Sequence, residues 1–211
     1  MKFDRNIMKR LALVLFALFI LGGGIQCLVA VRAGVEPASV WNYGLANALH
    51  ISFGTTQLVT NSVLFLSAIC FDRSQIGLGT FAGLIVVGYS VDFWGYIFRA
   101  ACPGIYDVTG LARVLLLVGA ILLVCVSAAT YMNCGLGASP LDMWPFIISK
   151  RLPNVSFKVI RFVYDTMFIL GGVLLGEKIG VVTIGTLFLM GPIIVFVGKH
   201  LKKFFPPIGP N

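Results

Sequence analysis

Six long runs of apolar residues constrain the fold of this sequence more than any other feature. Of its 211 residues 58% are hydrophobic and only 11% are charged, whereas an average globular domain has about 25% charged residues. A soluble fold of this size cannot bury so much apolar surface, so we expect lipid to cover part of the chain. This excludes a soluble enzyme, a disordered chain and a secreted disulfide scaffold. The runs are residues 11–32, 52–71, 76–98, 112–132, 160–176 and 179–198.

Each run has about the 20 apolar residues that a helix needs to cross a bilayer. The sequence therefore predicts an all-α, polytopic membrane protein with six transmembrane helices in a single membrane domain, residues 1–211. The first run follows basic residues, as in a signal peptide, but it continues to Val31 without a small-residue cleavage site, so we expect a retained first helix. Pro192 predicts a kink in the last run, and residues 199–211 form a short basic tail.

Lysine and arginine gather at alternate ends of the runs, which predicts the orientation of the chain. With the N-terminus inside, twelve of these residues lie on the cytoplasmic side and four outside, so we expect both termini in the cytoplasm. The net charge of +8 forms no basic stripe interleaved with aromatic residues, so we expect no nucleic-acid binding. The five cysteines have no CxxC spacing and no histidine at ligand distance, so we expect no metal and no other cofactor.

Similar motifs recur about one hundred residues apart, which predicts an internal repeat. Three spans in each half is an odd number, so the halves, about 11–98 and 112–198, would form two inverted 3+3 repeats. Each half also contains a segment too short to span, residues 37–50 and 140–152, and we expect a short interfacial or re-entrant helix in each. The matching pairs are 34–39 with 135–140, Ser52-Phe53 with Ser156-Phe157, and Gly79-Thr80 with Gly185-Thr186, at offsets of 101, 104 and 106 residues.

An ordered set of motifs in both halves resembles the YczE/YyaS/YitT group of bacterial integral membrane proteins. The resemblance covers the chain from about residue 11 to 198, and the first-half turn departs from it with Glu36-Pro37-Ala38-Ser39. It implies a multi-pass protein of the bacterial cytoplasmic (inner) membrane, without an established activity. The motifs are Ser52-Phe53-Gly54-Thr55, Gly77-Leu78-Gly79-Thr80 with Asp92, Gly135-Leu136-Gly137-Ala138-Ser139-Pro140-Leu141-Asp142, Ser156-Phe157 with Arg161 and Asp165, Gly180 through Gly185-Thr186, and Gly191-Pro192.

Polar side chains inside the apolar runs are the candidates for a binding site, because an uncompensated charge in a membrane costs several kcal/mol. Arg161 and Asp165 are four residues apart, share a helix face, and form either a structural ion pair or a substrate contact. Gln57 and Asn61 stand at the repeat-equivalent positions. Asp92, deep in the third run, lies either at the outer interface or in a cavity.

The turn before the second short segment carries Gly135, Gly137, Ser139 and Pro140, and Ser139-Pro140 predicts a helix start. Asp142 in the first turn of this helix either complements the helix N-terminus or binds a coupling ion or proton. Glu36 in the corresponding first-half turn is expected to be a solvated charge of an outer loop. Although Gly137-Ala138-Ser139 is similar to the motif of intramembrane serine proteases, neither histidine lies where it could activate Ser139, so we expect no catalytic residue.

These observations predict a secondary transporter or permease for a small solute, with its site between the inverted halves. In this hypothesis Arg161 would hold a carboxylate or phosphate, and Asp165 or Asp142 would take up a coupling proton. The alternative is a non-transporting membrane scaffold or assembly partner, in which the same charges pair with one another. The expected partners are the lipid bilayer and a small-molecule or ion substrate, and the small-residue helix faces permit a homodimer. The substrate or coupling-ion candidates are Asn61, Gln57, Asp92, Asp142, Arg161 and Asp165.

Overall fold

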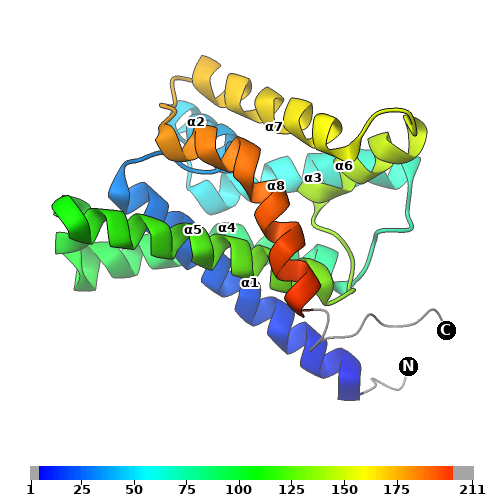
Figure 1. Cartoon of the computed structure of the whole chain (residues 1–211), viewed down its shortest axis with the longest axis horizontal. Coiled ribbons are helices and arrows are strands. Elements are labelled where there is room, and N and C mark those ends of the chain that lie inside the picture. Colours follow the sequence, from blue (N-terminus) through cyan, green and yellow to red (C-terminus); the bar gives the residue numbers. More distant parts are fainter. Residues whose placement is uncertain (1–4, 202–211) are drawn as a thin grey trace.

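A computed structural model describes residues 5–201 of the chain, and in this part helices joined by short connections are the only regular secondary structure (Figure 1). The predicted all-α class is confirmed, and both short segments form helices as expected. The elements are α1 (Arg5–Val31), α2 (Pro37–Leu49), α3 (Phe53–Phe71), α4 (Leu78–Ala101), a 3-10 helix η1 (Pro103–Asp107), α5 (Gly110–Asn133), α6 (Pro140–Arg151), α7 (Phe157–Leu174) and α8 (Val181–Leu201).

Four helices of the described range, α1, α3, α4 and α5, are long and apolar enough to cross a membrane. They correspond to the first four predicted runs. The fifth and sixth runs form α7 and α8, of 18 and 21 residues. Since α7 contains Lys158, Arg161 and Asp165, it is amphipathic rather than uniformly apolar. The molecule is thus a membrane protein with four helices that qualify as spans by length and composition.

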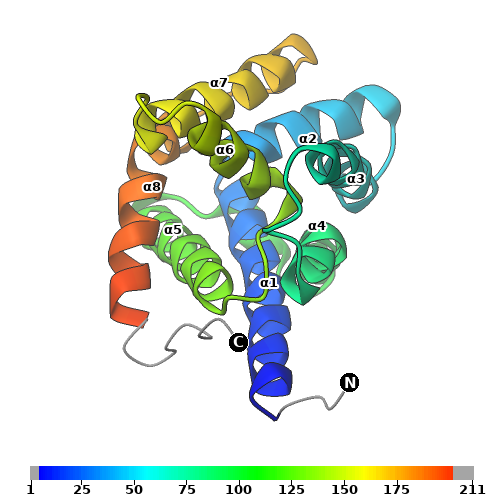
Figure 2. The same cartoon turned by 90° about the vertical axis from the view of Figure 1, so that its right-hand side faces the viewer.

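The two short helices begin in the same way. Each has an extended residue at the N-cap, Glu36 for α2 and Ser139 for α6, followed by proline at the first helical position. Proline suits this position because its missing N–H would have no helical partner there. With 13 and 12 residues, the two helices extend only about 18–20 Å, less than the hydrocarbon thickness of about 30 Å. In Figure 2, α2 lies across the view whereas α3 and α4 are seen nearly end-on.

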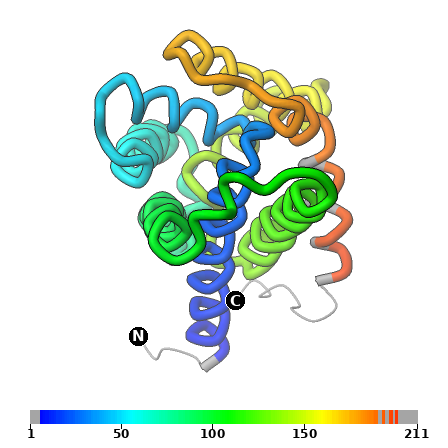
Figure 3. The backbone as a smooth tube through the Cα atoms, turned by 90° about the vertical axis from the view of Figure 1, so that its left-hand side faces the viewer, coloured from blue at the N-terminus to red at the C-terminus, as the bar shows by residue number. Residues whose placement is uncertain are grey.

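The helices form two layers. In the first layer α1 lies between α4 and α5, and α5 packs against α8 (Figure 3). In the second layer, α2 and α6 each pack against both α3 and α7. The layers meet where α3 contacts α4 and where α7 contacts α8. These contacts are symmetric between the two halves of the chain. If α1, α2, α3 and α4 are exchanged with α5, α6, α7 and α8 in that order, each contact between two of these helices becomes a contact that is also present.

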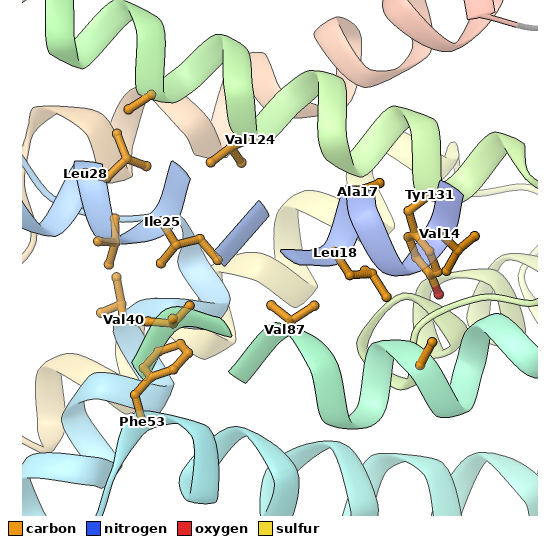
Figure 4. Close-up of a cluster of buried hydrophobic side chains, with 14 of the residues drawn as sticks. Val14, Ala17, Leu18, Ile25, Leu28, Val40, Phe53, Val87, Val124 and Tyr131 are labelled. Carbon is orange, nitrogen blue, oxygen red and sulfur yellow. The ribbon is translucent and has the colours of Figure 1, made fainter. Parts of the chain in front are cut away.

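The apolar core of the first layer surrounds α1, which is buried on most sides (Figure 4). A helix that is apolar all round belongs at the centre of its neighbours, and α1 has this composition. Its side chains meet those of α5 above and α4 below in Figure 4. The labelled core residues of the first layer are Val14, Ala17, Leu18, Ile25, Leu28, Val87, Val124 and Tyr131, and Val40 of α2 and Phe53 of α3 reach this core from the second layer.

The turn between α1 and α2 packs against the first residues of α8. Gly34 has φ of +99°, a conformation that favours glycine. The amide of Val182 donates to the carbonyl of Ala33 at 2.9 Å. A Cβ atom on Gly180 would lie 2.1 Å from the Ala33 oxygen, so only glycine fits there. The buried Thr183 hydroxyl then accepts from the Gly180 amide at 3.3 Å.

The turn between α5 and α6 makes the same set of contacts with the start of α4. Gly137 has φ of +106°, and the Gly79 amide donates to the carbonyl of Leu136 at 2.7 Å. A Cβ atom on Gly77 would lie 2.2 Å from the Leu136 oxygen. The Thr80 hydroxyl accepts from the Gly77 amide at 3.1 Å.

These contacts correct the register of the predicted repeat. Pro37 corresponds to Pro140, and Thr80 corresponds to Thr183, so both matches have an offset of 103 residues. The offset of 101 residues predicted for the turn, and that of 106 predicted for the Gly-Thr motif, are therefore wrong. The predicted offsets align identical residue types, whereas in the structure Pro37 and Pro140 begin α2 and α6. Likewise, Thr80 and Thr183 accept from the amides that precede α4 and α8.

Two arginines tie the ends of α1 and α5 together. The Arg113 guanidinium, in the first turn of α5, donates to the Val31 carbonyl at the end of α1 from Nε at 3.1 Å and Nη2 at 2.9 Å. At the opposite end, Arg10 Nη1 donates to the Cys134 carbonyl at 3.1 Å. Helix C-terminal carbonyls lack helical donors and carry partial negative charge, so a cation there satisfies both needs.

We expect Gly77→Ala and Gly180→Ala each to lower the free energy of unfolding by about 3 kcal/mol or more, because the added Cβ would meet a backbone oxygen that cannot move away. Gly119→Ala in α5 is the matched control, since no atom lies within 4 Å of the added Cβ there. Unfolding of the detergent-purified variants measures the effect. Equal stabilities of the three variants would contradict the close approach of the two turns.

We also expect Arg113→Gln to lower the free energy of unfolding by about 1 kcal/mol or more, because the Val31 carbonyl loses charged donors. Lys178→Gln, at an exposed lysine of the α7–α8 connection, serves as the control. Thermal unfolding in the same detergent compares them. An Arg113→Gln variant as stable as the control would show that the hydrogen bonds from Arg113 to Val31 contribute nothing to stability.

Candidate binding site between the helix layers

A cavity of about 190 Å³ lies between the two layers; we call it the central cavity. Its wall on the first layer is mainly apolar and includes Leu18, Leu21, Ile25, Val87 and Val124. Its wall on the second layer carries all of its charged residues, together with apolar ones such as Leu141 and Phe157. The polar residues of that wall are Glu36, Ser39, Asn42, Gln57, Asn61, Ser139, Asp142, Arg161 and Asp165.

Five of the six residues predicted as substrate or coupling-ion candidates meet at the central cavity. Asn61 and Gln57 reach it from α3, Asp142 from α6, and Arg161 and Asp165 from α7. Asn61 is only 2% exposed, and a buried amide is retained at a cost unless it has polar partners. Asn61 and Gln57 were predicted because they match Asp165 and Arg161 in the proposed repeat, and all four residues line this cavity.

Arg161 is held between two carboxylates. Its Nη1 donates to Asp142 Oδ1 at 2.6 Å and its Nε donates to Asp165 Oδ2 at 2.9 Å. The three side chains are 13–26% exposed. The sequence predicted the pairing of Arg161 with Asp165, but not the contact with Asp142, which depends on how α6 packs against α7.

Asp92 does not line the central cavity. Its Oδ2 accepts a hydrogen bond at 2.9 Å from the Gly54 amide, in the first turn of α3. Here α3 and α4 approach so closely that a Cβ on Gly54 would lie 2.6 Å from the same carboxylate oxygen. Asp92 thus satisfies a free N–H group at a helix N-terminus and complements the helix dipole.

The predicted turn before α6 positions Asp142. Gly135 and Gly137 have φ of +67° and +106°, and the chain then enters the helix at Ser139 and Pro140. The Ser139 side chain makes no capping hydrogen bond, but Ser139 lines the central cavity together with Asp142. The turn therefore brings the N-terminal end of α6, with its partial positive charge, to the cavity.

Glu36 is not the solvated loop charge that the sequence predicted. Its carboxylate lies at the central cavity, with Oε1 accepting from the Ser39 hydroxyl and Oε2 buried without a hydrogen-bond partner. Burial raises the pKa of the Glu36 carboxyl, and the hydrogen bond from Ser39 opposes this rise. The prediction failed because the α1–α2 turn folds inward onto α8, which hydropathy cannot reveal.

A further residue that the sequence analysis missed is Asn42, on the same face of α2. It is 2% exposed, and its Oδ1 is buried without a partner. The spacing of Glu36, Ser39 and Asn42, three residues apart each time, would have been a usable signal, since it places them along one face of a helix. All three line the central cavity.

A second cavity, of about 430 Å³, adjoins the first; we call it the vestibule. It is formed by the α3–α4 and α5–α6 connections, including the exposed Ser74 and Gly135. Met132, Asp142 and Phe146 line both cavities and therefore form their boundary. Within the described residues no group of three His, Cys, Asp or Glu side chains is arranged to hold a metal ion.

The fold and this site define a helical membrane protein with a charged cavity between its helix layers. A model of a family described as a family of unknown function, DUF6198, matches residues 8–199, and the chain belongs to this family. No solved structure matches the chain.

Two relatives are similar over most of their length. An uncharacterized protein of Haemophilus influenzae is 28% identical over 188 residues, which is 89% of this chain and 83% of that protein. The uncharacterized membrane protein YczE of Bacillus subtilis is 25% identical over 181 residues, 85% of this chain and 80% of that protein. The resemblance to YczE-like membrane proteins predicted from the sequence is confirmed.

We expect Arg161→Gln to lower the free energy of unfolding by about 3 kcal/mol or more, because two partly buried carboxylates lose their cation. Lys158→Gln, one turn earlier on an exposed part of α7, should have little effect. The triple variant with Asp142→Asn, Arg161→Gln and Asp165→Asn should regain part of the loss, since it leaves no unpaired charge in this cluster. Chemical unfolding in detergent measures the free energy of unfolding of each variant. If Arg161→Gln is no less stable than the triple variant, the energetic coupling between Arg161 and the two carboxylates is contradicted.

Proposed function

We propose that the protein is a secondary transporter of a small solute and that the central cavity is its substrate site. The observation that carries this proposal is the concentration of charge around an open volume inside a membrane protein. Charged groups in a membrane are costly, and they mark pathways for ions and substrates. Three carboxylates and one guanidinium line a cavity of about 190 Å³. Pockets for drug-sized ligands typically have about 300–1,000 Å³, so the volume of this cavity fits a smaller solute.

We further infer that the chain consists of two inverted halves with three spans each, α7 and α8 being the fifth and sixth. The exchange symmetry of the helix contacts supports this arrangement, as do the paired contacts of the two turns. The charges on α7 are compatible with a span, because Arg161 and Asp165 face the cavity and bind each other. Binding sites of such transporters lie near the midplane, between the repeats.

The distribution of basic residues supports placing the vestibule on the cytoplasmic side of the inner membrane. The α3–α4 connection next to it carries Arg73, and the C-terminal end of α6 carries Lys150 and Arg151. Basic residues at the ends of spans favour the cytoplasm. We therefore infer that this conformation is accessible from the inside.

The C-terminal ends of the short helices are tied down on opposite sides of the molecule. Lys150 of α6 binds Asp72 at 2.5 Å, and hydrogen bonding to Lys150 lowers the pKa of Asp72 to about 2. Asn47 of α2 donates to Glu177, in the α7–α8 connection, at 3.0 Å. Alternating access would need the two short helices to shift relative to these connections, so we propose the two contacts as the inner and outer restraints.

The state of Arg161 argues against an anionic substrate held by its guanidinium. Its Nη1 and Nε already donate to Asp142 and Asp165. With Glu36 included, the cavity holds three carboxylates against this single cation, so its charge favours a cation or a proton. The proposal therefore assigns Arg161 the role of internal counterion.

The alternative of a non-transporting scaffold predicts that the charges pair off completely. The Arg161 cluster is compatible with either hypothesis. The unpartnered buried oxygens of Glu36 and Asn42 favour a cavity that receives a ligand, because a structural core rarely leaves such atoms unsatisfied. We also propose that the protein is not an enzyme, since Ser139 begins a helix and His50 is an exposed residue at the other end of α2.

Uptake by proteoliposomes tests the transport proposal. A radiolabelled panel of amines, amino acids, organic acids and sugars should contain at least one solute that the protein accumulates above empty vesicles. Asp142→Asn and Asn61→Leu should each lower the initial rate of that uptake at least tenfold, because the first removes a charge and the second removes a polar group from the cavity wall. Asp107→Asn, at an exposed position of η1, should leave the rate unchanged. Full uptake in both cavity variants would refute the assignment of the site.

A further inference from the structure

We propose that Glu36 binds the ammonium group of a small solute whose apolar part lies against α1. The inference deepens the proposed function and rests on it for the location of the ligand between the two halves. It names the chemical class of the ligand and the carboxylate that recognises it. Neither followed from the sequence, which placed Glu36 in solvent.

The hydrogen bonds of Glu36 leave one of its carboxylate oxygens without a partner. Oε1 accepts from Ser39, in the first turn of α2. Oε2 is buried and has no partner. A buried carboxylate oxygen needs a hydrogen-bond donor or a cation, because leaving it unsatisfied costs the full desolvation penalty. The central cavity is the open space next to this residue.

The repeat shows which partner is missing. In the first half the short helix begins with Glu36 and has Ser39 three residues later; in the second half it begins with Ser139 and has Asp142 three residues later. Each half thus brings one carboxylate and one hydroxyl to the cavity, in exchanged order.

The second-half carboxylate has its own cation, and the first-half carboxylate has none. Arg161 donates to Asp142, whereas the residue that corresponds to Arg161 in the first half is the neutral Gln57. Arg161 does not compensate Glu36, because its described hydrogen bonds go to Asp142 and Asp165. A cationic ligand near Gln57 would take the place that an arginine occupies in the other half.

The other groups at the cavity favour an ammonium group over a bare metal ion. Asn42 Oδ1 is a second buried acceptor without a partner on the same face of α2. An ammonium group has three N–H donors, which unpartnered oxygens of this kind need and a bare metal ion lacks. The opposite wall carries Leu18, Leu21 and Ile25, which supply no oxygen ligand and fit an apolar body instead.

Equilibrium binding to the detergent-purified full chain tests the proposal with four probes. Isobutylammonium has both the cation and the apolar body, methylammonium lacks the body, isobutanol lacks the charge, and sodium ion lacks the donors. We expect isobutylammonium to bind at least tenfold more tightly than each of the other three. Calorimetry measures the affinities, and the rise in unfolding temperature with ligand gives an independent readout.

Two variants locate the site, and one serves as a control. Glu36→Gln keeps the shape of the side chain and should weaken isobutylammonium binding at least tenfold, without changing the binding of isobutanol. Asp107→Asn neutralises an exposed carboxylate of η1 that does not line the central cavity and should bind like the wild type. Gln57→Arg supplies the missing cation within the chain, so it should abolish isobutylammonium binding. Because it also compensates Glu36, this variant should unfold at a temperature no lower than the wild type.

Specific results would overturn the proposal. One such result is that isobutanol or sodium ion binds as tightly as isobutylammonium. The other is that Gln57→Arg binds isobutylammonium as tightly as the wild type does. If Glu36→Gln does not fold, the Gln57→Arg result decides alone. Binding without uptake in proteoliposomes would refute transport and leave this inference standing. Uptake of another solute without ammonium binding would refute the inference and leave transport standing.

Discussion

The close approach of each turn to a helix of the other half is the contact on which the site depends. Gly180 meets the Ala33 carbonyl, and Gly77 meets the Leu136 carbonyl, at distances that allow no side chain. These contacts pull the α1–α2 and α5–α6 turns inward, so that both short helices begin at the central cavity. Their N-terminal N–H groups carry partial positive charge there. This position explains how acidic side chains at both helix starts are accommodated between the layers.

The charged residues of the central cavity all lie on one wall because of how the helices are divided between layers. The first layer is built around α1, which is apolar on all sides and is enclosed by α4 and α5. It therefore contributes mainly aliphatic side chains. The second layer contains both short helices and the amphipathic α7, so the charged groups come from that side. A solute with one charged end and one apolar end matches both walls at once.

The sequence predicted the parts of this protein that follow from hydropathy and local chemistry. The apolar runs gave the helices and the short segments, and Ser139-Pro140 gave the start of α6. Spacing along one helix predicted the pair of Arg161 with Asp165. Contacts between distant elements could not be predicted in this way. Asp142 joins that pair through the packing of α6 on α7, and Glu36 becomes buried because its turn folds onto α8.

The two halves differ in how their carboxylates at the central cavity are compensated. If both halves carried an arginine at the position of Arg161, each carboxylate near a short-helix start would have a permanent partner, and no ligand would be needed. With Gln57 in the first half, one carboxylate is compensated within the chain and the other, Glu36, is not. Under the proposed repeat, the neutral Gln57 leaves the first-half carboxylate without an internal cation, and the proposed ammonium ligand would supply that charge.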